Sequence, residues 1–177
     1  PNRIINDLHI VVHGDGCGIW TLLHAEDAAT AIMQLAISNI SLGDIINIVS
    51  DRRYTWLNIT SLLFLLLGKS EKIVFLPAII INTISPYLGN GIIGHKMWND
   101  FYDNKKLKSI LPNWVPSLSL EDGLRKSINW YMADTKRQHI SEELDLLINQ
   151  MVHAAKQSDI KRLLYEKVSI HVVNNIP

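Results

Sequence analysis

The first 77 residues alternate between apolar runs and polar stretches, and three of the apolar runs have the character of β-strands. The first alternates apolar and polar positions and predicts a strand that ends near His13. The β-branched run Asp44–Ser50 predicts a strand that is buried on both faces. A third, short strand is predicted at 72–77, where Pro77 ends it.

Two helices are predicted between these strands. The first begins at Asp27 and runs to about Ser38, and the second begins at a Thr55 cap and ends at Gly68 and Lys69. The apolar residues of the first helix are predicted to share one stripe: Ala28, Ala31, Ile32 and Leu35. The order strand, helix, strand, helix, strand is typical of an α/β layer.

The second half of the chain has a mostly helical pattern. Residues 79–94 are apolar and interrupted by glycines, which predicts an irregular segment, and a short helix is predicted at 103–111. Longer helices are predicted after the caps Ser119 and Ser141. A short amphipathic helix and an extended end are predicted in the tail, 158–177. The expected core residues here are Leu120, Leu124, Ile128, Tyr131, Leu144, Leu147, Ile148, Met151, Ala155, Trp114 and Trp130.

The charge balance and the single cysteine narrow the function classes. Lys+Arg and Asp+Glu are equal at 17 each, so the chain lacks the basic surface expected of a protein that binds nucleic acid or an anionic membrane. Because Cys17 is the single cysteine of the sequence, an internal disulfide is excluded. Since no signal peptide and no run of about 20 apolar residues is visible, the sequence predicts a cytoplasmic protein with no membrane partner.

The glycines at Gly14, Gly16 and Gly18 raise the question of a dinucleotide site. A dinucleotide fingerprint reads G-x-G-x-x-G and leads directly into a helix, whereas Ile19–His24 intervene here. Asp51 follows the second predicted strand, roughly where a ribose-binding acid would fall, and is the one feature in favour. The pattern favours a turn between two extended segments.

Two further patterns are interpreted as coincidence. Tyr102 and Lys106 have the Y-x-x-x-K spacing of an acid/base pair, which requires one helical turn to carry both residues. Asp103 and Asn104 look like a helix cap, which would leave Tyr102 outside the helix.

A second group of residues could hold zinc if they shared the face of one strand: His9, His13 and Asp15. No other His or Cys cluster accompanies them, so the sequence predicts no metal site.

Three motifs in order resemble the extended short-chain dehydrogenase/reductase family, the NAD-dependent sugar-nucleotide epimerases and dehydratases. The motifs are GDGCGIWTLLHAEDAATAI at 14–32, GDIINIVSDRRYTWLNI at 43–59 and FYDNKKLKSILPNWVPSLSLEDGLRKSINWY at 101–131. The resemblance extends from about His9 to about Lys156.

The resemblance implies that half of such an enzyme is absent. In that family the cofactor fingerprint and the Ser/Thr, Tyr, Lys set belong to the amino-terminal half, so NAD or NADP would be bound mainly by that missing half. The implied fold is α/β, with the terminal strands and helices of a Rossmann-like doubly wound sheet and a small, mostly helical substrate-binding lobe in residues 1–157. The tail at 158–177 lies outside the resemblance. The start at Pro1 rather than Met fits a fragment.

The resemblance also implies a set of site residues. The nucleotide-contacting Arg of the family falls on Trp20 and the following Asp on Thr21, and a second Arg falls near His95–Lys96. Lys96 is therefore the expected phosphate partner, with a solvated lysine as the alternative. Trp20 can stack on a ring but cannot clamp a diphosphate as a guanidinium does.

A structural role is implied for two further residues, His24 and Asp27, which match the H-V-x-D of the family. They are expected to fix the loop and to cap the following helix.

Two functions stay open. The chain is either the substrate-binding portion of an NAD(P)-dependent epimerase, dehydratase or reductase, inactive alone and acting on a sugar nucleotide or related small molecule, or a free-standing binding or interaction module derived from that fold. The predicted strands at 44–50 and 72–77 are apolar on both faces and would lack neighbours. This favours the first function and predicts that the isolated chain aggregates or forms homo-oligomers.

Overall fold

A computed structural model describes residues 1–38, 43–139 and 141–157 of the chain. Its strands are β1 (Ile10–His13), β2 (Ile19–Thr21), β3 (Arg53–Thr55) and β4 (Ile73–Leu76). Its α-helices are α1 (Asn2–Ile5), α2 (Ala25–Ala36), α3 (Trp56–Leu66), α4 (Ala78–Ile84), α5 (Pro86–Gly91), α6 (Lys105–Ile110), α7 (Leu120–Met132) and α8 (Glu142–Lys156). A π-helical turn, η1 (Ile92–Lys96), and a 3-10 turn, η2 (Thr135–Gln138), complete the described elements.

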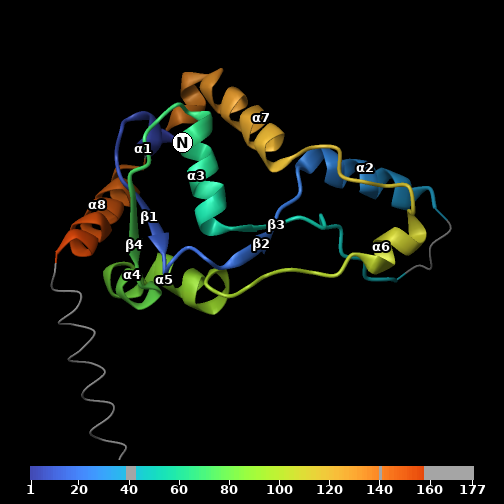
Figure 1. The fold of residues 1–177 in the computed structure, drawn as a ribbon, viewed down its shortest axis with the longest axis horizontal. Helices are drawn as coiled ribbons and strands as arrows, with labels where there is room; N and C mark the ends of the chain where they lie inside the picture. The colour runs from blue at the N-terminus through green and yellow to red at the C-terminus, as the bar shows by residue number, and fades with distance from the viewer. Residues whose placement is uncertain (39–42, 140, 158–177) are drawn as a thin grey trace, which may run out of the picture.

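The elements gather at two ends of an elongated molecule. Figure 1 shows β1 and β4 at one end with α1, α3, α4, α5 and α8 around them, and α2 and α6 at the other end, with β2 and β3 in between. None of the described helices has the length and apolar character needed to cross a membrane. The predictions for the tail, 158–177, fall outside the described residues.

Two of the three predicted strands are confirmed as a small parallel sheet. β1 and β4 pair in parallel from Ile10 opposite Ile73 to His13 opposite Leu76. A second sheet joins β2 and β3 in an antiparallel pair, with Trp20 opposite Tyr54, and Trp20 also bridges to Asp100. The second sheet therefore brings three distant parts of the chain together around Trp20.

The strand predicted at Asp44–Ser50 is wrong for the described chain. Residues 44–50 have no regular secondary structure, although Ile46 and Ile48 pack against a buried cluster of Ala31, Leu35, Leu107 and Trp114. Ile45, on the other side of the segment, is 86% exposed. A strand needs a neighbour that completes its hydrogen bonds, and the part of the chain that the structure describes places none beside this run.

The predicted helices of both halves are confirmed, and their caps explain their starts. The Thr55 hydroxyl accepts a hydrogen bond from the Asn58 amide, while the Asn58 side chain accepts one from the Thr55 amide, which forms a capping box for α3. The hydroxyls of Ser119 and Ser141 cap α7 and α8 in the same way. α2 begins slightly before Asp27, because His24 is its cap.

The segment predicted to be irregular, 79–94, is helical instead. The Ser85 hydroxyl caps α5, and Pro86 occupies its first turn, where the missing N–H costs nothing. A Cβ at Gly89 would lie 2.2 Å from Asn82 Cα, so only glycine lets α5 approach α4 this closely. One of the glycines that suggested irregular structure in the sequence, Gly89, instead permits helix contact.

Three side chains predicted to be buried lie on the surface, and one of them, Leu144, is 41% exposed. Trp130 is 61% exposed, and the Arg137 guanidinium lies 4.2 Å above its ring. Ile32 is 55% exposed, because it lies on the outer side of α2 while Ala31 and Leu35 face the core. A second buried cluster, Leu76, Ile81 and Met151, joins β4, α4 and α8.

The glycine loop is a turn that leads into β2 and also supports the start of α3. The carbonyl of Gly16 accepts a hydrogen bond from the Leu57 amide at 3.0 Å, and the carbonyl of Gly18 accepts one from the Trp56 amide at 3.3 Å. Gly14 and Gly16 have positive φ values of 61° and 75°. The amides that could have bound a phosphate at this helix terminus are therefore occupied.

We predict that Gly16→Ala destabilises the fold more than Gly14→Ala. A Cβ at position 16 would lie 3.0 Å from Val12 Cγ1 and 3.1 Å from Leu57 Cβ, whereas a Cβ at position 14 would meet no atom within 4 Å. Both substitutions carry the positive-φ cost of about 1 kcal/mol, and steric overlap adds about 1–3 kcal/mol at position 16 alone. Urea unfolding of the two variants measures the difference. Equal unfolding free energies would contradict the assigned close packing.

Candidate functional site

Four aromatic rings from four elements meet beside the carboxyl end of β1. The ring of Trp20 on β2 lies 4.9 Å from that of Trp56 on α3 and 5.1 Å from that of His95 on η1. The ring of His13 on β1 lies 5.6 Å from Trp56 in an edge-on arrangement. We call these four residues the aromatic cluster.

One backbone carbonyl holds two members of the aromatic cluster in place. The Lys96 carbonyl accepts hydrogen bonds from Trp56 Nε1 and from His13 Nε2, each at 3.0 Å. Burial lowers the pKa of His13, and the Lys96 ammonium lowers it further against the opposing effect of the carbonyl bond. His13 is therefore a neutral ring near pH 7, whose Nε2 carries the hydrogen.

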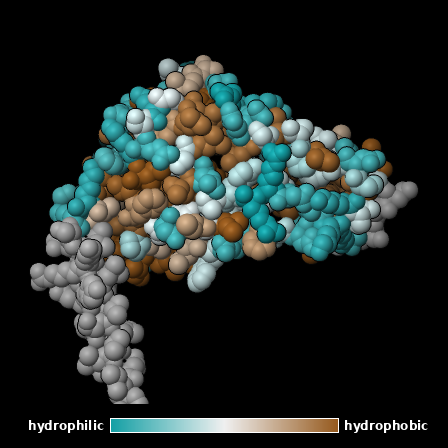
Figure 2. Space-filling view, viewed as in Figure 1, coloured by the Kyte–Doolittle hydropathy of each residue, from teal (hydrophilic) through white to brown (hydrophobic). Residues whose placement is uncertain are grey.

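A cavity of about 400 Å³ opens next to the aromatic cluster, between β1, α3, η1 and α8. Its polar lining residues are Arg3, His13, Thr60 and Lys96, and Trp56 forms part of one wall. The remaining lining is aliphatic: Ile10, Val11, Val12, Ile81, Leu88, Ile92, Leu144, Ile148 and Met151. Figure 2 shows hydrophobic residues gathered on this end of the molecule. A largely apolar hollow with a few polar groups is typical of a small-molecule site.

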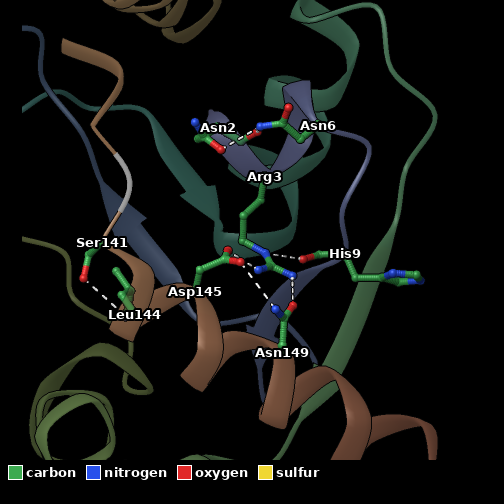
Figure 3. Close-up of polar contacts among 8 residues, drawn as sticks. All are labelled: Asn2, Arg3, Asn6, His9, Ser141, Leu144, Asp145 and Asn149. Carbon is green, nitrogen blue, oxygen red and sulfur yellow. Dashed lines mark hydrogen bonds and ion pairs between the residues drawn. The ribbon is translucent and has the colours of Figure 1, made fainter. Parts of the chain in front are cut away.

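The wall that α8 provides is fastened by Arg3. The buried Arg3 side chain donates from Nε to the His9 carbonyl at 2.9 Å and from NH2 to Asn149 Oδ1 at 2.9 Å, and it forms an ion pair with Asp145. Figure 3 shows the guanidinium between α1 and two successive turns of α8. α8 is thereby fixed against the face of β1.

The structure brings two of the three predicted substrate-binding residues close together. Trp20 contacts Trp56 and His95, and Lys96 follows His95 directly and lines the cavity. Thr21 points to the other face of β2, where it lines a separate polar hollow of about 530 Å³ with Arg53 and Asp51.

Two polar atoms on β2 are buried without a partner. Within the described ranges, neither Trp20 Nε1 nor Thr21 Oγ1 has a hydrogen-bond partner. Each such group costs about 1–3 kcal/mol when it is left unpaired. The packing around Trp20 and Thr21 must therefore offset the cost of leaving these two groups without a hydrogen bond.

His24 and Asp27 lie at the start of α2, where they connect it to the segment before α7. His24 Nδ1 accepts a hydrogen bond from the Glu26 amide at 3.2 Å. The buried carboxylate of Asp27 accepts hydrogen bonds from the Ser117 amide and hydroxyl and from the Leu118 amide, at 2.7–3.1 Å. Burial raises the pKa of Asp27, but these hydrogen bonds together outweigh burial and hold the pKa below its usual value.

Other residues considered from the sequence are engaged elsewhere. Tyr102 precedes α6 and lies outside it, and Lys106 forms an ion pair with Asp44 at 3.0 Å, so the Y-x-x-x-K spacing does not place the two on one helical turn. The Asp51 carboxylate accepts hydrogen bonds from Lys108 at 2.7 Å and from Asn104 at 3.1 Å. The described residues contain no group of three metal-binding side chains.

Sequence reasoning missed Trp56 and did not connect His13 with Lys96. Trp56 is the first residue of α3, directly after the capping Thr55, so its position at the N-terminus of a helix could have been inferred from the cap. The hydrogen bond between His13 and the Lys96 carbonyl depends on the π-helical turn η1, which the sequence pattern does not indicate.

Comparisons with known proteins place this geometry in a common fold. No family model matches the chain. By sequence, it is 25% identical over 123 residues to the trifunctional UDP-glucose 4,6-dehydratase/UDP-4-keto-6-deoxy-D-glucose 3,5-epimerase/UDP-4-keto-L-rhamnose-reductase of Arabidopsis thaliana, over 68% of this chain and 16% of that protein.

Two solved structures share the fold. One is UDP-glucuronic acid 4-epimerase from Bacillus cereus in complex with NAD, with a TM-score of 0.54, 22% identity, and coverage of 70% of this chain and 34% of that one. The other is dTDP-glucose 4,6-dehydratase from Bacillus anthracis in complex with NAD, with a TM-score of 0.59, 20% identity, and coverage of 76% and 38%. The α/β, Rossmann-like fold prediction is confirmed, and the chain spans little more than a third of each solved chain.

We predict that Asp27 makes stability depend on acid pH. Its carboxylate has a lowered pKa in the folded state, so its contribution is fully present above the unfolded value of about 3.9 and is lost as the pH falls through the folded pKa. Asp27→Asn should lower the unfolding free energy by about 1–3 kcal/mol at pH 7 and by progressively less below pH 4.

Chemical denaturation of wild type and Asp27→Asn between pH 3 and pH 7 measures this effect. Glu26→Gln is the control, because the Glu26 carboxylate pairs with Lys126 on the surface, where ion pairs contribute little. Wild-type and Asp27→Asn curves that stay parallel across the whole pH range would contradict the assignment.

Proposed function

We propose that the chain is the substrate-binding part of an NAD(P)-dependent epimerase, dehydratase or reductase of the cytoplasm, and that residues outside it supply the cofactor site and the catalytic groups. Its substrate is a sugar nucleotide or a related small molecule. The observation that carries the proposal is the cavity beside the aromatic cluster, on a fold shared with NAD-bound enzymes. The chain alone is expected to be inactive.

The described residues do not fit a dinucleotide cofactor by themselves. The carbonyls of Gly16 and Gly18 occupy the first amides of α3, so this helix terminus offers no amides to a pyrophosphate. The acid that would bind a ribose, Asp51, is neutralised by Lys108. NAD or NADP would therefore depend on a part of the enzyme beyond these residues.

The second support is an apolar surface at the α2 end of the molecule. α2 carries an outer stripe at helical spacing, made of Ala29, Ile32, Met33, Ala36 and the following Ile37, and all five are exposed. Met33 is 68% and Ile37 84% exposed, although the opposite stripe of α2 is buried. Residues 44–50 pair with no strand within the ranges that the structure describes. Together with this run, the outer stripe of α2 has the character of a contact with further sheet or helix.

The alternative is a free-standing binding or interaction module that kept the substrate lobe. The same cavity supports this alternative, because binding of a small molecule in it does not require a cofactor. The two functions differ in what the gene encodes around this chain, so the gene itself provides the deciding test.

We predict that the reading frame upstream of Pro1 continues and encodes a strand, a glycine-rich loop, a helix and a Y-x-x-x-K motif. A protein that includes this part should retain NAD(H), detected by cofactor fluorescence, whereas the 177-residue chain should not. A stop codon or a start codon directly before Pro1 would contradict the enzyme proposal, and the binding module would remain as the function.

We also predict that the isolated chain self-associates through the outer stripe of α2. The double substitution Met33→Glu/Ile37→Glu should shift its sedimentation toward the monomer, because carboxylates at both positions make an apolar contact costly. Val115→Glu, at an exposed apolar residue elsewhere, is the control and should leave sedimentation unchanged. A wild-type chain that sediments as a stable monomer would count against a missing partner.

A further inference from the structure

The cavity beside the aromatic cluster contains little charge for its size. Of its fourteen lining residues, nine are aliphatic, and none is Asp or Glu. The groups that could carry positive charge are Arg3, His13 and Lys96. Which of these three remains available decides what kind of ligand the cavity can hold.

Arg3 is not available to a ligand. Its guanidinium pairs with Asp145 and donates hydrogen bonds to Asn149 and to the His9 carbonyl, so its charge is neutralised and its donors face protein atoms. Removing it from these partners would leave Asp145 unpaired in a half-buried position, which is costly.

The neutral polar groups of the wall are also engaged. His13 Nε2 and Trp56 Nε1 both donate to the Lys96 carbonyl, and the Thr60 hydroxyl donates to the Trp56 carbonyl at 2.8 Å. His13 is uncharged near pH 7, because burial lowers its pKa. These groups shape the wall but bring no positive charge to it.

Of the three groups that could carry positive charge, the Lys96 ammonium remains available to a ligand. It lies close enough to lower the pKa of His13 by its charge, and in the described part of the chain no carboxylate lies within ion-pair distance of it. A single lysine matches one negative charge. A nucleoside diphosphate carries at least two charges on its phosphates and is normally held by guanidinium groups in forked geometry, which this wall does not offer.

We propose that the cavity takes a ligand with an apolar body and a single anionic group, of the chemical class of a medium-chain carboxylate, in place of a nucleoside diphosphate. The apolar body contacts the aliphatic wall formed by β1 and α8, and the anionic group pairs with Lys96. This inference rests on the proposed function, because it takes the cavity to be the substrate site of that enzyme part.

Calorimetric titration of the 177-residue chain with decanoate, decanol and UDP tests the inference, with decanoate below its critical micelle concentration and decanol below its solubility limit. Decanoate should bind at least about tenfold more tightly than UDP. Lys96→Met should weaken decanoate about tenfold, the usual effect of losing one charged hydrogen bond, and leave decanol unchanged. The substitution keeps the Lys96 carbonyl that holds His13 and Trp56.

Two further variants locate the ligand. Ile148→Trp fills the cavity from α8 and should abolish binding of both decanoate and decanol, while Lys136→Met, on the exposed η2 turn, should change neither. Circular dichroism and melting curves confirm that each variant folds. Decanoate binding that is unaffected by Lys96→Met or by Ile148→Trp would overturn the assignment to this cavity.

The outcomes separate this inference from the proposed function. UDP binding tighter than decanoate and dependent on Lys96 would overturn the ligand class but support the enzyme proposal. Decanoate binding with the expected dependence on Lys96, together with a stop codon before Pro1, would support the ligand class and overturn the enzyme proposal. A folded chain that binds no probe would overturn the inference.

Discussion

The glycine loop between β1 and β2 is the constraint on which the candidate site depends. Its Gly16 and Gly18 carbonyls accept hydrogen bonds from the first amides of α3, so one short turn fixes β1, the β2–β3 pair and α3 relative to one another. Trp56 is at the first position of that helix and His13 at the end of that strand. The Lys96 carbonyl accepts a hydrogen bond from each of these side chains, so the aromatic cluster depends both on the backbone path and on the two donor rings.

Local signals in the sequence predicted most of the fold. The features that depend on contacts between distant parts of the chain could not be predicted. The caps at Thr55, Ser119 and Ser141 predicted three helix starts, because a cap acts within one turn. Residues 44–50 have a strand composition but lack a neighbour within the described residues, and strand formation depends on that neighbour. Lys96 could be selected from a resemblance, whereas its contact with His13 could not, since their separation in sequence carries no pattern.

The two ends of the molecule differ in how completely they bury their apolar residues. At the α8 end, helices cover the β1–β4 sheet and leave a cavity. At the α2 end, one helix has an apolar stripe on each side, and residues that the structure describes cover only one of the two. The proposed function accounts for this asymmetry, because a substrate-binding part of a larger enzyme has one surface for substrate and another for the remaining enzyme.

The Arg3 ion pair has a consequence for the order in which the molecule is made. Arg3 and Asp145 are separated by 142 positions, so the cavity lacks its α8 wall until almost all of the described chain has left the ribosome. At a synthesis rate of about 5–20 residues per second, Arg3 waits roughly 7–30 s for its partner. During that interval β1 exposes its apolar face, and α1 holds a guanidinium with no carboxylate to neutralise it. The nascent chain therefore exposes this face of β1 until its last described helix appears.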